Sequence, residues 1–499
     1  MNRRKFIQSS AALSAIGAAP FVPFSISTAD AGTITPSADE SGYRALVCLF
    51  LFGGNDSHNM IVPFQTSEYN SYAASRNGQA AGNGLALPLA SLLPISPTGL
   101  GSSSLGFHPA MPSMQALFAD AAKPLAIVAN TGPLLSETTL SQYQTSNVEL
   151  PPQLFSHSDM QMHWQSMRPD QPAVTGWGGR IADVFRVASS GRLPVSIGLG
   201  GGGIFMKGDI ATPYQVMPVR YASGAIDPRT RIARTPVAEI NWNWTGSKPQ
   251  DVFINDYSSA RANLLEQQYG RLTKGSLEIG EFVGNAMYAE NAGNYSLRNA
   301  VPWSSAAGVL NNPLAAQLHA VAAMIAARQA LGTTRQVFFV SLGGFDNHGD
   351  QFGNVNNTKS LLAGKHYSLL SLVDQALKTF YDATVSMGVS NLVTTMTMSD
   401  FGRTLKSNGQ GSDHGWGSHQ LVLGGAVNGG RVYGDFPFAA KLPLIDIGQG
   451  RLLPEIAADV YTARLAQWFG ANSTELATIF PNLSRFPSHL PKVASLMKS

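Results

Sequence analysis

The chain of 499 residues contains a single cysteine, Cys48. One thiol excludes an intramolecular disulfide framework and a structural zinc site built from thiolates. Because Cys48 lies inside the apolar run "RALVCLFLF", we interpret it as a buried and inert thiol. The sequence therefore predicts a protein that is stabilised by its core alone, and the chain is long enough for a large one.

Charged residues are also scarce, since they make up 13% of the chain, against roughly 25% in typical globular domains. There are 34 basic and 31 acidic residues. Residues 1–31 hold three of the basic residues and one of the acidic ones, so the remainder carries a net charge of about +1. A nucleic-acid-binding protein needs a basic face. No such face is visible in this sequence, and we expect no nucleic-acid partner.

After the N-terminal segment, no stretch reaches the ~18 uninterrupted apolar residues that a membrane-spanning helix needs. The N-terminus, "MNRRKFIQSSAALSAIGAAPFVPFSISTADAG", carries Arg3 and Arg4 before an alanine-rich apolar segment and has a small-x-small pattern at residues 29–31. These features are typical of a twin-arginine export signal, although an ordinary secretory signal or an uncleaved anchor shares some of them. We predict a signal peptide at residues 1–31 that engages the twin-arginine export machinery, and a flexible leader at residues 32–42. The mature protein is then periplasmic or secreted and has no transmembrane segment.

Apolar runs of strand length alternate with helical segments along the rest of the chain. The runs "RALVCLFLF", "PLAIVANTG", "RQVFFVSLGG" and "NLVTTMTMS" read as buried strands, and "NPLAAQLHAVAAMIAARQALG" and "HYSLLSLVDQALKTFYDATVSMG" read as helices. This alternation predicts an α/β fold with a mostly parallel sheet and helices on both faces. We expect a single domain over residues 43–499. The region around residues 185–300, which is rich in Gly, Asn, Trp and Tyr, reads as an inserted cap or irregular segment.

Polar residues follow the predicted strands at four places. These groups are Asp56; Asp346 with His348; Asp400 with Arg403; and Asp413 with His414 and His419. The crevice beyond the carboxyl ends of parallel strands is where such folds place their sites. Carboxylates with imidazoles suit zinc, manganese or iron, and carboxylates alone suit magnesium or calcium. The pattern therefore predicts a divalent metal site, and two ions about 3.5–4 Å apart can clamp both oxygens of a phosphoryl or sulfuryl transfer.

Each group also has a simpler interpretation. An aspartate after "GGN" forms an Asx turn in many proteins, and we interpret His108, His319, His366 and His489 as surface or satisfied core histidines. The stretch "SDHGWGSH" favours a site more strongly, because Gly415 lets the backbone turn beside the Asp-His pair. It is the combination of the four groups that favours a metal site.

Read in order, the motifs resemble a widespread family of twin-arginine-exported bacterial proteins that is known only as a domain of unknown function. That family is grouped with the alkaline phosphatase and sulfatase superfamily. The matching stretches are "FLFGGNDSHNMIVP", "FSHSDMQ", "GWGGRIAD", "SLGGFDNHGDQ", "SDFGRT", "SDHGWGSHQLVLGGAVNGGRVYG" and "GRLLPEIAADVY". They cover essentially the whole mature chain. The resemblance implies an alkaline-phosphatase-like core with a two-metal site.

The resemblance also implies roles for individual residues. Ser156 matches the serine of the family's Ser-His pair and is the expected nucleophile, with Ser57, Ser158 and Thr131 as alternatives. The implied metal ligands are Asp56, Asp346, His348, Asp413, His414 and His419, with Asp400 either holding a metal or orienting Arg403, and with Arg180 and Arg403 binding a tetrahedral oxyanion. No cysteine occupies a sulfatase-like nucleophile motif, which disfavours a formylglycine sulfatase.

The sequence thus leads to two functional hypotheses of different classes. The first is an exported hydrolase of phosphate or sulfate esters, small or polymeric, that uses divalent metal ions and a serine nucleophile. The alternative is a non-catalytic exported protein that uses the same fold to bind a surface polymer, a glycan or a partner protein. An oxidoreductase is a weaker hypothesis, since the chain has neither a Rossmann fingerprint nor a haem motif.

Overall fold

The computed structural model of the protein describes residues 42–78, 84–100, 103–186, 193–201, 203–216, 266, 279, 282–283, 312–356 and 358–498. The predicted signal peptide, nearly all of the predicted leader and most of the predicted insertion lie outside these residues. The part of the insertion that is described contributes two short strands to the edge of the main sheet.

The main sheet is built around the apolar run that begins at Arg44. This run forms β1 (Arg44–Phe52), which pairs in parallel with β8 (Arg335–Gly343) on one side and β11 (Val393–Ser399) on the other. Within the described residues the sheet has nine strands, in the order β15-β5-β14-β11-β1-β8-β6-β7, with β16 also paired to β5. The other strands are β5 (Leu125–Gly132), β6 (Ser196–Gly198), β7 (Tyr214–Gln215), β14 (Ser418–Gly424), β15 (Val432–Tyr433) and β16 (Ile456–Ala457).

The predicted α/β fold and mostly parallel sheet are confirmed. The antiparallel pairings in the main sheet are those of β14 with its neighbours β11 and β5. Between β11 and β14 the chain forms a hairpin of β12 (Arg403–Ser407) and β13 (Ser412–His414), which returns it to the same end of the sheet. The connection contains no crossover helix, so β14 starts where β11 ends and runs the opposite way.

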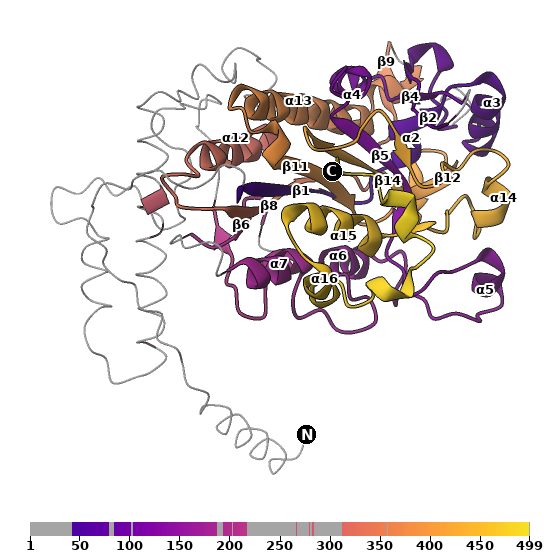
Figure 1. Ribbon diagram of the computed structural model, residues 1–499. Coiled ribbons are helices and arrows are strands. Elements are labelled where there is room, and N and C mark those ends of the chain that lie inside the picture. Colours follow the sequence, from indigo (N-terminus) through magenta and orange to yellow (C-terminus); the bar gives the residue numbers. More distant parts are fainter. Residues whose placement is uncertain are drawn as a thin grey trace. The chain divides into compact units, whose positions relative to one another are not determined.

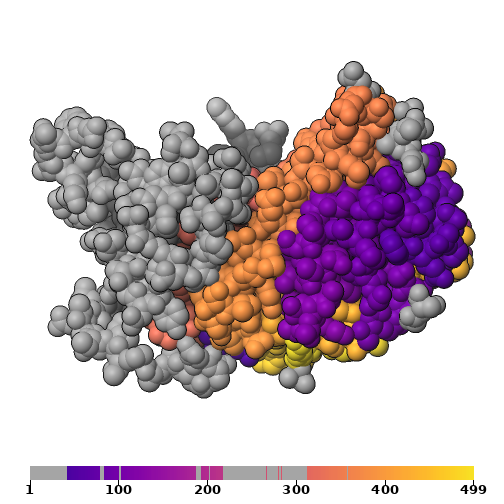
Figure 2. Space-filling model, turned by 90° about the horizontal axis from the view of Figure 1, so that it is seen from above, coloured from indigo at the N-terminus to yellow at the C-terminus, as the bar shows by residue number. Residues whose placement is uncertain are grey.

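Helices cover both faces of the sheet (Figure 1). One face carries α4 (Pro112–Ala119), α12 (Pro313–Ala326) and α13 (Lys365–Ser386); the other carries α6 (His157–Ser166), α7 (Trp177–Phe185), α15 (Ala458–Phe469) and α16 (Ser473–Ile479). Seen from the first face, the orange part of the chain that includes α13 lies against the purple part that includes α4 (Figure 2). Their contact is fixed by the Asp374 carboxylate, which accepts the N–H groups of Ser113 and Met114 at the start of α4.

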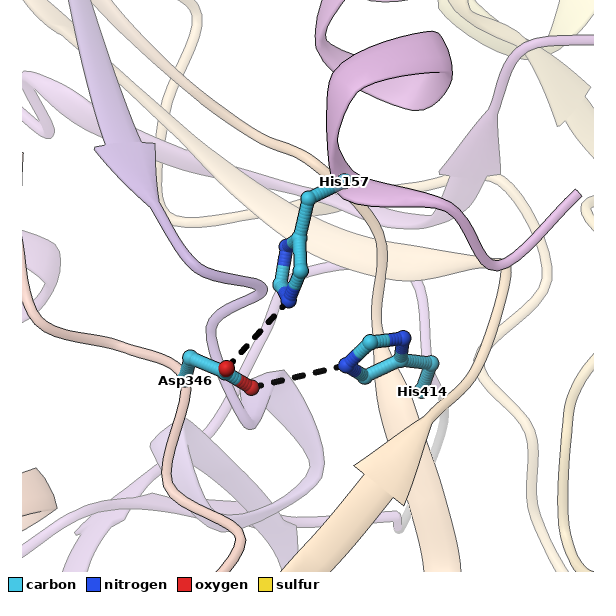
Figure 3. Close-up of side chains that lie close together, drawn as sticks. All are labelled: His157, Asp346 and His414. Atoms are coloured by element: carbon cyan, nitrogen blue, oxygen red, sulfur yellow. Dashed lines mark ion pairs between the residues drawn. The ribbon is translucent and has the colours of Figure 1, made fainter. Parts of the chain in front are cut away.

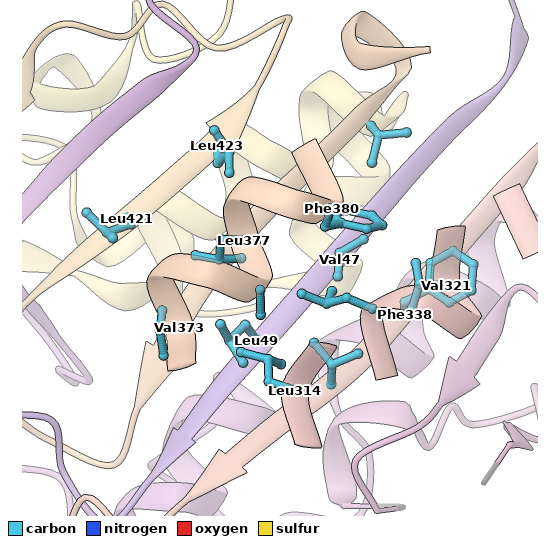
Figure 4. Packing of buried hydrophobic residues seen from close by; sticks show 14 of the residues in the cluster. Val47, Leu49, Leu314, Val321, Phe338, Val373, Leu377, Phe380, Leu421 and Leu423 are labelled. Atoms are coloured by element: carbon cyan, nitrogen blue, oxygen red, sulfur yellow. The ribbon is translucent and has the colours of Figure 1, made fainter. Parts of the chain in front are cut away.

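Alternate residues of β1 enter two separate cores because a strand's side chains alternate between its faces. Val47 and Leu49 pack with the helices α12 and α13, as Figure 4 shows. Leu46, Cys48 and Phe50 pack on the opposite face, against the other helices. Cys48 is fully buried, as the sequence predicts. Burial on both faces explains why β1 is apolar along nearly its whole length.

Smaller elements complete the described chain. They are α2 (Ser57–Met60), β2 (Ile61–Pro63), α3 (Thr66–Ser75), β3 (Leu93–Ile95), β4 (Leu105–Phe107), α5 (Leu140–Gln144), β9 (Gly353–Val355), β10 (Thr358–Ser360) and α14 (Leu442–Ile445), together with short 3₁₀ turns. Among the helices of the described ranges, none combines the length and the apolar character needed to cross a bilayer.

The register of the three central strands sets the position of the site. Leu51 of β1 lies opposite both Leu342 of β8 and Ser399 of β11, so the three strands end at the same level. The loops that follow them carry Asp56, Asp346 and Asp400. Parallel strands thus bring to one end of the sheet three loops that are far apart in the sequence.

Candidate metal centre at the strand ends

Two glycines allow the loops after the central strands to touch. Gly53 has a φ of +113°, and a Cβ there would overlap the backbone of Phe345 and Asp346. Gly54 has a φ of +79° and lies against the ring of Phe401. Both conformations and both contacts require glycine. The "GGN" stretch is therefore what lets the loop after β1 pack between the loops after β8 and β11.

Three histidines converge on Asp346 where these loops meet. His348 Nε2 lies 3.1 Å and His414 Nε2 3.4 Å from Asp346 Oδ1. His157 Nε2 lies 3.4 Å from Asp346 Oδ2. Figure 3 shows His157 approaching this carboxylate from the start of α6 and His414 from the end of β13. The Asp346 side chain is 46% exposed, so the cluster is open to solvent.

Each of the three imidazoles is held through its other nitrogen. His157 Nδ1 lies 2.7 Å from Asp400 Oδ2, and His348 Nδ1 lies 2.9 Å from Asp413 Oδ1. His414 Nδ1 lies 2.6 Å from the carbonyl oxygen of Phe155. Because a carboxylate or carbonyl oxygen can only accept, each Nδ1 must carry the hydrogen and donate it. In the neutral rings, all three Nε2 atoms are then bare acceptors that face the same point.

The close approach of these nitrogens favours a proton or a metal ion between them. The Nε2 atoms of His348 and His414 are only 2.8 Å apart. Two lone pairs at that distance repel each other unless a proton or a metal ion lies between them. His157 Nε2 is buried and has no hydrogen-bond partner among the described residues. The cluster therefore brings together one unpartnered acceptor, at His157, and two imidazole nitrogens that need a shared proton or a metal ion between them.

The charges of the cluster are consistent with a cation site. The hydrogen bond to Asp400 raises the pKa of His157, although burial opposes this effect. Burial lowers the pKa of His414, and the neighbouring positive groups lower it further. Burial alone would raise the pKa of Asp346, but the charges of Arg403 and of the nearby histidines outweigh it and lower the pKa. Asp346 thus stays ionised at neutral pH.

The residues present fit a divalent metal ion. One ligand atom each from His157, Asp346 and His414 lie within 4.8 Å of one another. Ligands about 2.1 Å from a tetrahedral zinc ion lie about 3.4 Å apart. His157 Nε2 lies 3.4 Å from Asp346 Oδ2, and His414 Nε2 lies 3.4 Å from Asp346 Oδ1. His348 is a fourth candidate ligand in the same cluster. A set of imidazoles with one carboxylate suits zinc, manganese or iron better than magnesium or calcium.

Asp400 holds His157, one of the histidines of the cluster, in its orientation. It is fully buried, and its Oδ1 accepts the N–H of Gly53. Its Oδ2 accepts from both His157 Nδ1 and Gln161 Nε2. The sequence predicts Asp400 either as a metal ligand or as a residue that orients Arg403. The structure instead places it behind His157, where a carboxylate fixes the tautomer and the orientation of a histidine ligand.

The two predicted oxyanion-binding arginines are occupied elsewhere. Every guanidinium nitrogen of Arg180 donates to a protein oxygen, at Ser166, Thr175 or Ile479. Arg403 donates to Ser412, to the carbonyl of Gly53 and to Asp346. The prediction that both bind a tetrahedral oxyanion therefore needs correction. Arg180 ties the core together, and Arg403 holds Asp346 in place.

The predicted early ligand, Asp56, lies in a different environment. It is 1% exposed and forms an ion pair with Arg76, which is completely buried. Its Oδ2 also accepts from Gln351, while its Oδ1 has no partner among the described residues. Burial alone would raise the pKa of Asp56, but the charge of Arg76 and its other neighbours lower it to about 2. The charge of Asp56 is thus compensated within the protein, and it does not join the histidine cluster.

His419 is also separate from the cluster. Its Nδ1 accepts the backbone N–H of Asn130 at 3.1 Å, so in the neutral ring its Nε2 carries the hydrogen. A protonated Nε2 has no lone pair for a metal ion. The ring stacks on Phe436 and lies edge-to-face with His58. The predicted ligand role of His419 therefore has no basis in its hydrogen bonding.

Ser156, the predicted nucleophile, immediately precedes His157 at the start of α6. Its hydroxyl donates to Asp159 Oδ2 at 2.5 Å, and Ser158 Oγ lies 3.2 Å away. The Asp159 carboxylate can therefore accept the proton of the Ser156 hydroxyl. The serine lies next in sequence to a residue of the cluster, and its role as nucleophile remains a prediction.

Sequence reasoning did not include His157 in the site. The available signal was its position in the "FSHSDMQ" stretch, which supplies Ser156, but no predicted strand ends there. His157 reaches the cluster because α6 packs beside the carboxyl end of β11. Phe155, just before it, has a left-handed backbone with a φ of 72°, which is uncommon for an aromatic residue. Its carbonyl is the one that holds His414.

These observations define an α/β protein with a histidine-carboxylate cluster at the carboxyl ends of its central parallel strands. The family described as "Protein of unknown function (DUF1501)" matches residues 43–443, and the chain belongs to that family. No curated protein matches the sequence.

Proposed function

We propose that the protein is an exported, metal-dependent hydrolase of phosphate or sulfate esters, and a member of the alkaline phosphatase and sulfatase superfamily. The observation that carries this proposal is the convergence of three acceptor Nε2 atoms on Asp346, each oriented by a hydrogen bond at Nδ1. Export through the twin-arginine pathway to the periplasm is part of the proposal and rests on Arg3, Arg4 and the segment after them.

His157, Asp346 and His414 would hold the cation, with His348 beside them. A divalent ion bound there would polarise a phosphoryl or sulfuryl oxygen and neutralise the charge that develops on it. Zinc, manganese and iron fit the ligand set best. Asp400, Asp413 and the Phe155 carbonyl keep the three rings in the tautomer that binds a metal.

In this proposal Ser156 attacks the phosphorus or sulfur of the ester. A bond forms between Ser156 Oγ and that atom, the bond to the alcohol oxygen breaks, and the Ser156 proton passes through Asp159 to the departing alcohol. Water then hydrolyses the serine ester and regenerates the hydroxyl. Because the Asp346 side chain is 46% exposed, a substrate can reach the cluster from solvent.

The first experiment measures metal content and turnover in the same purified protein. We expect at least one equivalent of a transition metal, and hydrolysis of an aryl phosphate or aryl sulfate that a chelator abolishes and added metal restores. The substitution His157→Ala should remove metal and turnover together. The substitution Ser156→Ala should keep the metal and lower turnover on the order of a thousandfold or more. Ser473→Ala, at the exposed start of α16, provides the hydroxyl control and should leave both unchanged.

Three outcomes would count against parts of the proposal. A protein that binds no divalent metal and hydrolyses neither substrate class would overturn it. Tight metal binding without turnover would instead support the alternative of an exported binding protein for a polymer, glycan or protein partner. Activity that survives in Ser156→Ala would remove only Ser156 as the nucleophile.

A further inference from the structure

The stretch "GRLLPEIAADVY" has no role in the site described above, yet its Arg451 lies beside the cluster. Arg451 donates from Nε to the backbone carbonyl of His414 at 2.9 Å. Its guanidinium carbon lies 5.2 Å from the centre of the Phe155 ring, in a cation–π contact. His414 is a residue of the cluster, and the carbonyl of Phe155 holds the His414 ring. Both anchors of Arg451 therefore belong to the cluster and its immediate support.

The two outer nitrogens of Arg451 have no acceptor in the protein. Nη1 and Nη2 donate to no oxygen of the described residues, and both reach solvent. A guanidinium group carries five N–H donors in a planar fork, and the contact with His414 uses the one at Nε. The other four can bind an oxyanion, through two parallel hydrogen bonds where the anion is a carboxylate or a phosphate.

The guanidinium is held in place without a ligand. Its two contacts orient the side chain, and the backbone of Arg451 closes a turn in which its N–H donates to Gly448 and its carbonyl accepts from Ile447. This turn is joined to β12, because the N–H of Leu405 donates to the carbonyl of Gly450. A side chain that is already ordered loses little conformational entropy when it binds a ligand. Arg451 is therefore prepared to bind an anion.

Arg451 differs in this respect from Arg180 and Arg403, the arginines that the resemblance indicates for oxyanion binding. Each guanidinium nitrogen of those two residues donates to an oxygen of the protein. Both groups are also buried, whereas Arg451 is partly exposed. Of these three guanidinium groups, that of Arg451 is the one that an anion from solvent can reach.

The position of Arg451 indicates which part of a substrate it contacts. Arg451 binds the backbone carbonyl of His414, whereas the ring Nε2 of His414 faces Asp346. The length of one residue therefore lies between the guanidinium and the centre of the cluster. An ester group held at the centre is the part that reacts, so Arg451 reaches a different group of the same molecule.

We propose that Arg451 determines specificity by binding a second anionic group of the substrate, a carboxylate, phosphate or sulfate on the alcohol part of the ester. The substrate class is then an ester of phosphate or sulfate whose alcohol carries a further negative charge. This inference rests on the proposed function, because it names the substrate class of the same cluster. The anion is bound by Nη1 and Nη2, while Nε stays on the carbonyl of His414.

The test is a calorimetric titration of the full-length, zinc-loaded protein with phosphonates, which it cannot hydrolyse. The acids 3- and 4-carboxyphenylphosphonate carry the second anion, and the corresponding carboxamides have the same shape without its charge. We expect at least one acid to bind about tenfold more tightly than its amide, because it gains hydrogen bonds to a charged donor. The measurement reports binding and does not require turnover.

Three substitutions make the test specific. Arg451→Met removes the guanidinium and should bind each acid and its amide equally. Arg451→Lys keeps the charge without the planar fork and should retain a weaker preference for the acid. Arg431→Met is the matched control, because Arg431 is also partly exposed but contacts Ile127 in the amino half of β5, and it should show the preference of the unmodified protein. The zinc content and melting temperature of each variant verify that it is loaded and folded.

Equal binding of the acids and their amides by the unmodified protein would overturn this inference alone, because the cluster would still bind the phosphonate group. A preference for the acid that persists in a folded Arg451→Met protein would overturn it as well, since another group would then bind the second anion. If none of the phosphonates binds the zinc-loaded protein, the inference fails together with the proposed function.

Discussion

The Asp346 cluster and the Asp56–Arg76 ion pair lie at the ends of neighbouring strands, but they differ in exposure and in charge balance. Asp56 and Arg76 are both buried, and each compensates the other. Asp346 is half-exposed and faces three acceptor nitrogens. In sequence, both aspartates follow an apolar strand and a pair of glycines. Similar sequence motifs thus lead to an internal ion pair in one region and to a candidate metal site in the other.

A hydrogen-bonded chain connects the two regions. Gln351 donates to Asp56 and accepts from the Ser412 hydroxyl. Arg403 in turn donates to Ser412 and to Asp346. The buried pair is thus linked to the exposed cluster. We expect changes at the buried pair to alter stability and changes in the cluster to alter metal binding, and the four predictions below test this difference.

The largest effect is expected from Arg76→Met. This substitution leaves Asp56 buried without its counter-ion, which typically costs about 3–5 kcal/mol of unfolding free energy. Chemical denaturation measures it. The double variant Asp56→Asn with Arg76→Met is the control and should recover a large part of the loss. If Arg76→Met alone unfolds at the denaturant concentration of the unmodified protein, the ion pair is not what stabilises this region.

The next effect is the loss of stability in acid. The pKa values of His58 and His366 are both lowered to about 4, with burial as the main cause. The unfolded chain takes up these protons as the pH falls below about 6.5, while the folded protein does so only near pH 4. Each histidine thus lowers stability by about 1.4 kcal/mol per pH unit across that window.

Thermal unfolding at pH 7 and at pH 5 tests this dependence. His366→Gln keeps a donor for Asn55, which His366 Nε2 contacts at 2.9 Å, but cannot titrate. Its loss of stability between the two pH values should be smaller than that of the unmodified protein. Other buried histidines with lowered pKa values, His108 and His319 among them, contribute the remaining slope. Equal slopes for the two proteins would contradict the assignment to His366.

A smaller effect, on metal binding, is expected from Asp400→Asn. An amide nitrogen facing His157 Nδ1 favours the wrong tautomer, and loss of such a supporting carboxylate typically lowers metal affinity about 10–100-fold. Competition with a chromophoric chelator measures the affinity. Asp382→Asn, on the exposed part of α13, is a control and should have no effect. Unchanged affinity in Asp400→Asn would mean that His157 is not a ligand.

The smallest change in stability is expected from Asp346→Asn. Because the Asp346 side chain is 46% exposed, its ion pairs are screened, and we expect the metal-free protein to change by no more than about 1 kcal/mol. Metal binding should nevertheless be lost. A large loss of stability in the metal-free protein would show that Asp346 stabilises the fold, as Asp56 does.

Much of the fold follows from local sequence patterns. The runs that form β1, β5 and β8 are largely apolar, as strands buried on both faces require. β11 is also buried along its whole length, although threonines are interspersed there with valine and methionines. The helical periods of α12 and α13 are equally clear in the sequence. The antiparallel direction of β14 was not predicted, because a strand's direction depends on its connection rather than on its composition.

The residues of the site were predicted only in part. Asp346 and His348 follow β8, and Asp413 and His414 lie in β13 of the hairpin after β11; the structure brings all four together. His157 lies at the start of a helix, so the pattern of polar residues after strands does not include it. Asp56 and His419 have side chains that can bind a metal ion. In the structure, however, Asp56 pairs with Arg76, and His419 accepts the N–H of Asn130. Such competition for partners depends on tertiary contacts, which span 20 positions for Asp56 and 289 for His419.

The sequence by itself determined the α/β class, the central strands and the end of the sheet at which polar groups gather, because hydrophobic periodicity and glycine positions act locally. Only the tertiary structure decided which polar groups share a cluster, which are neutralised in the core and which nitrogen of each histidine faces inward. Those outcomes depend on distances of a few ångströms between loops. They follow from the sheet register and from the packing of α6, and both of these depend on segments that are distant in the sequence.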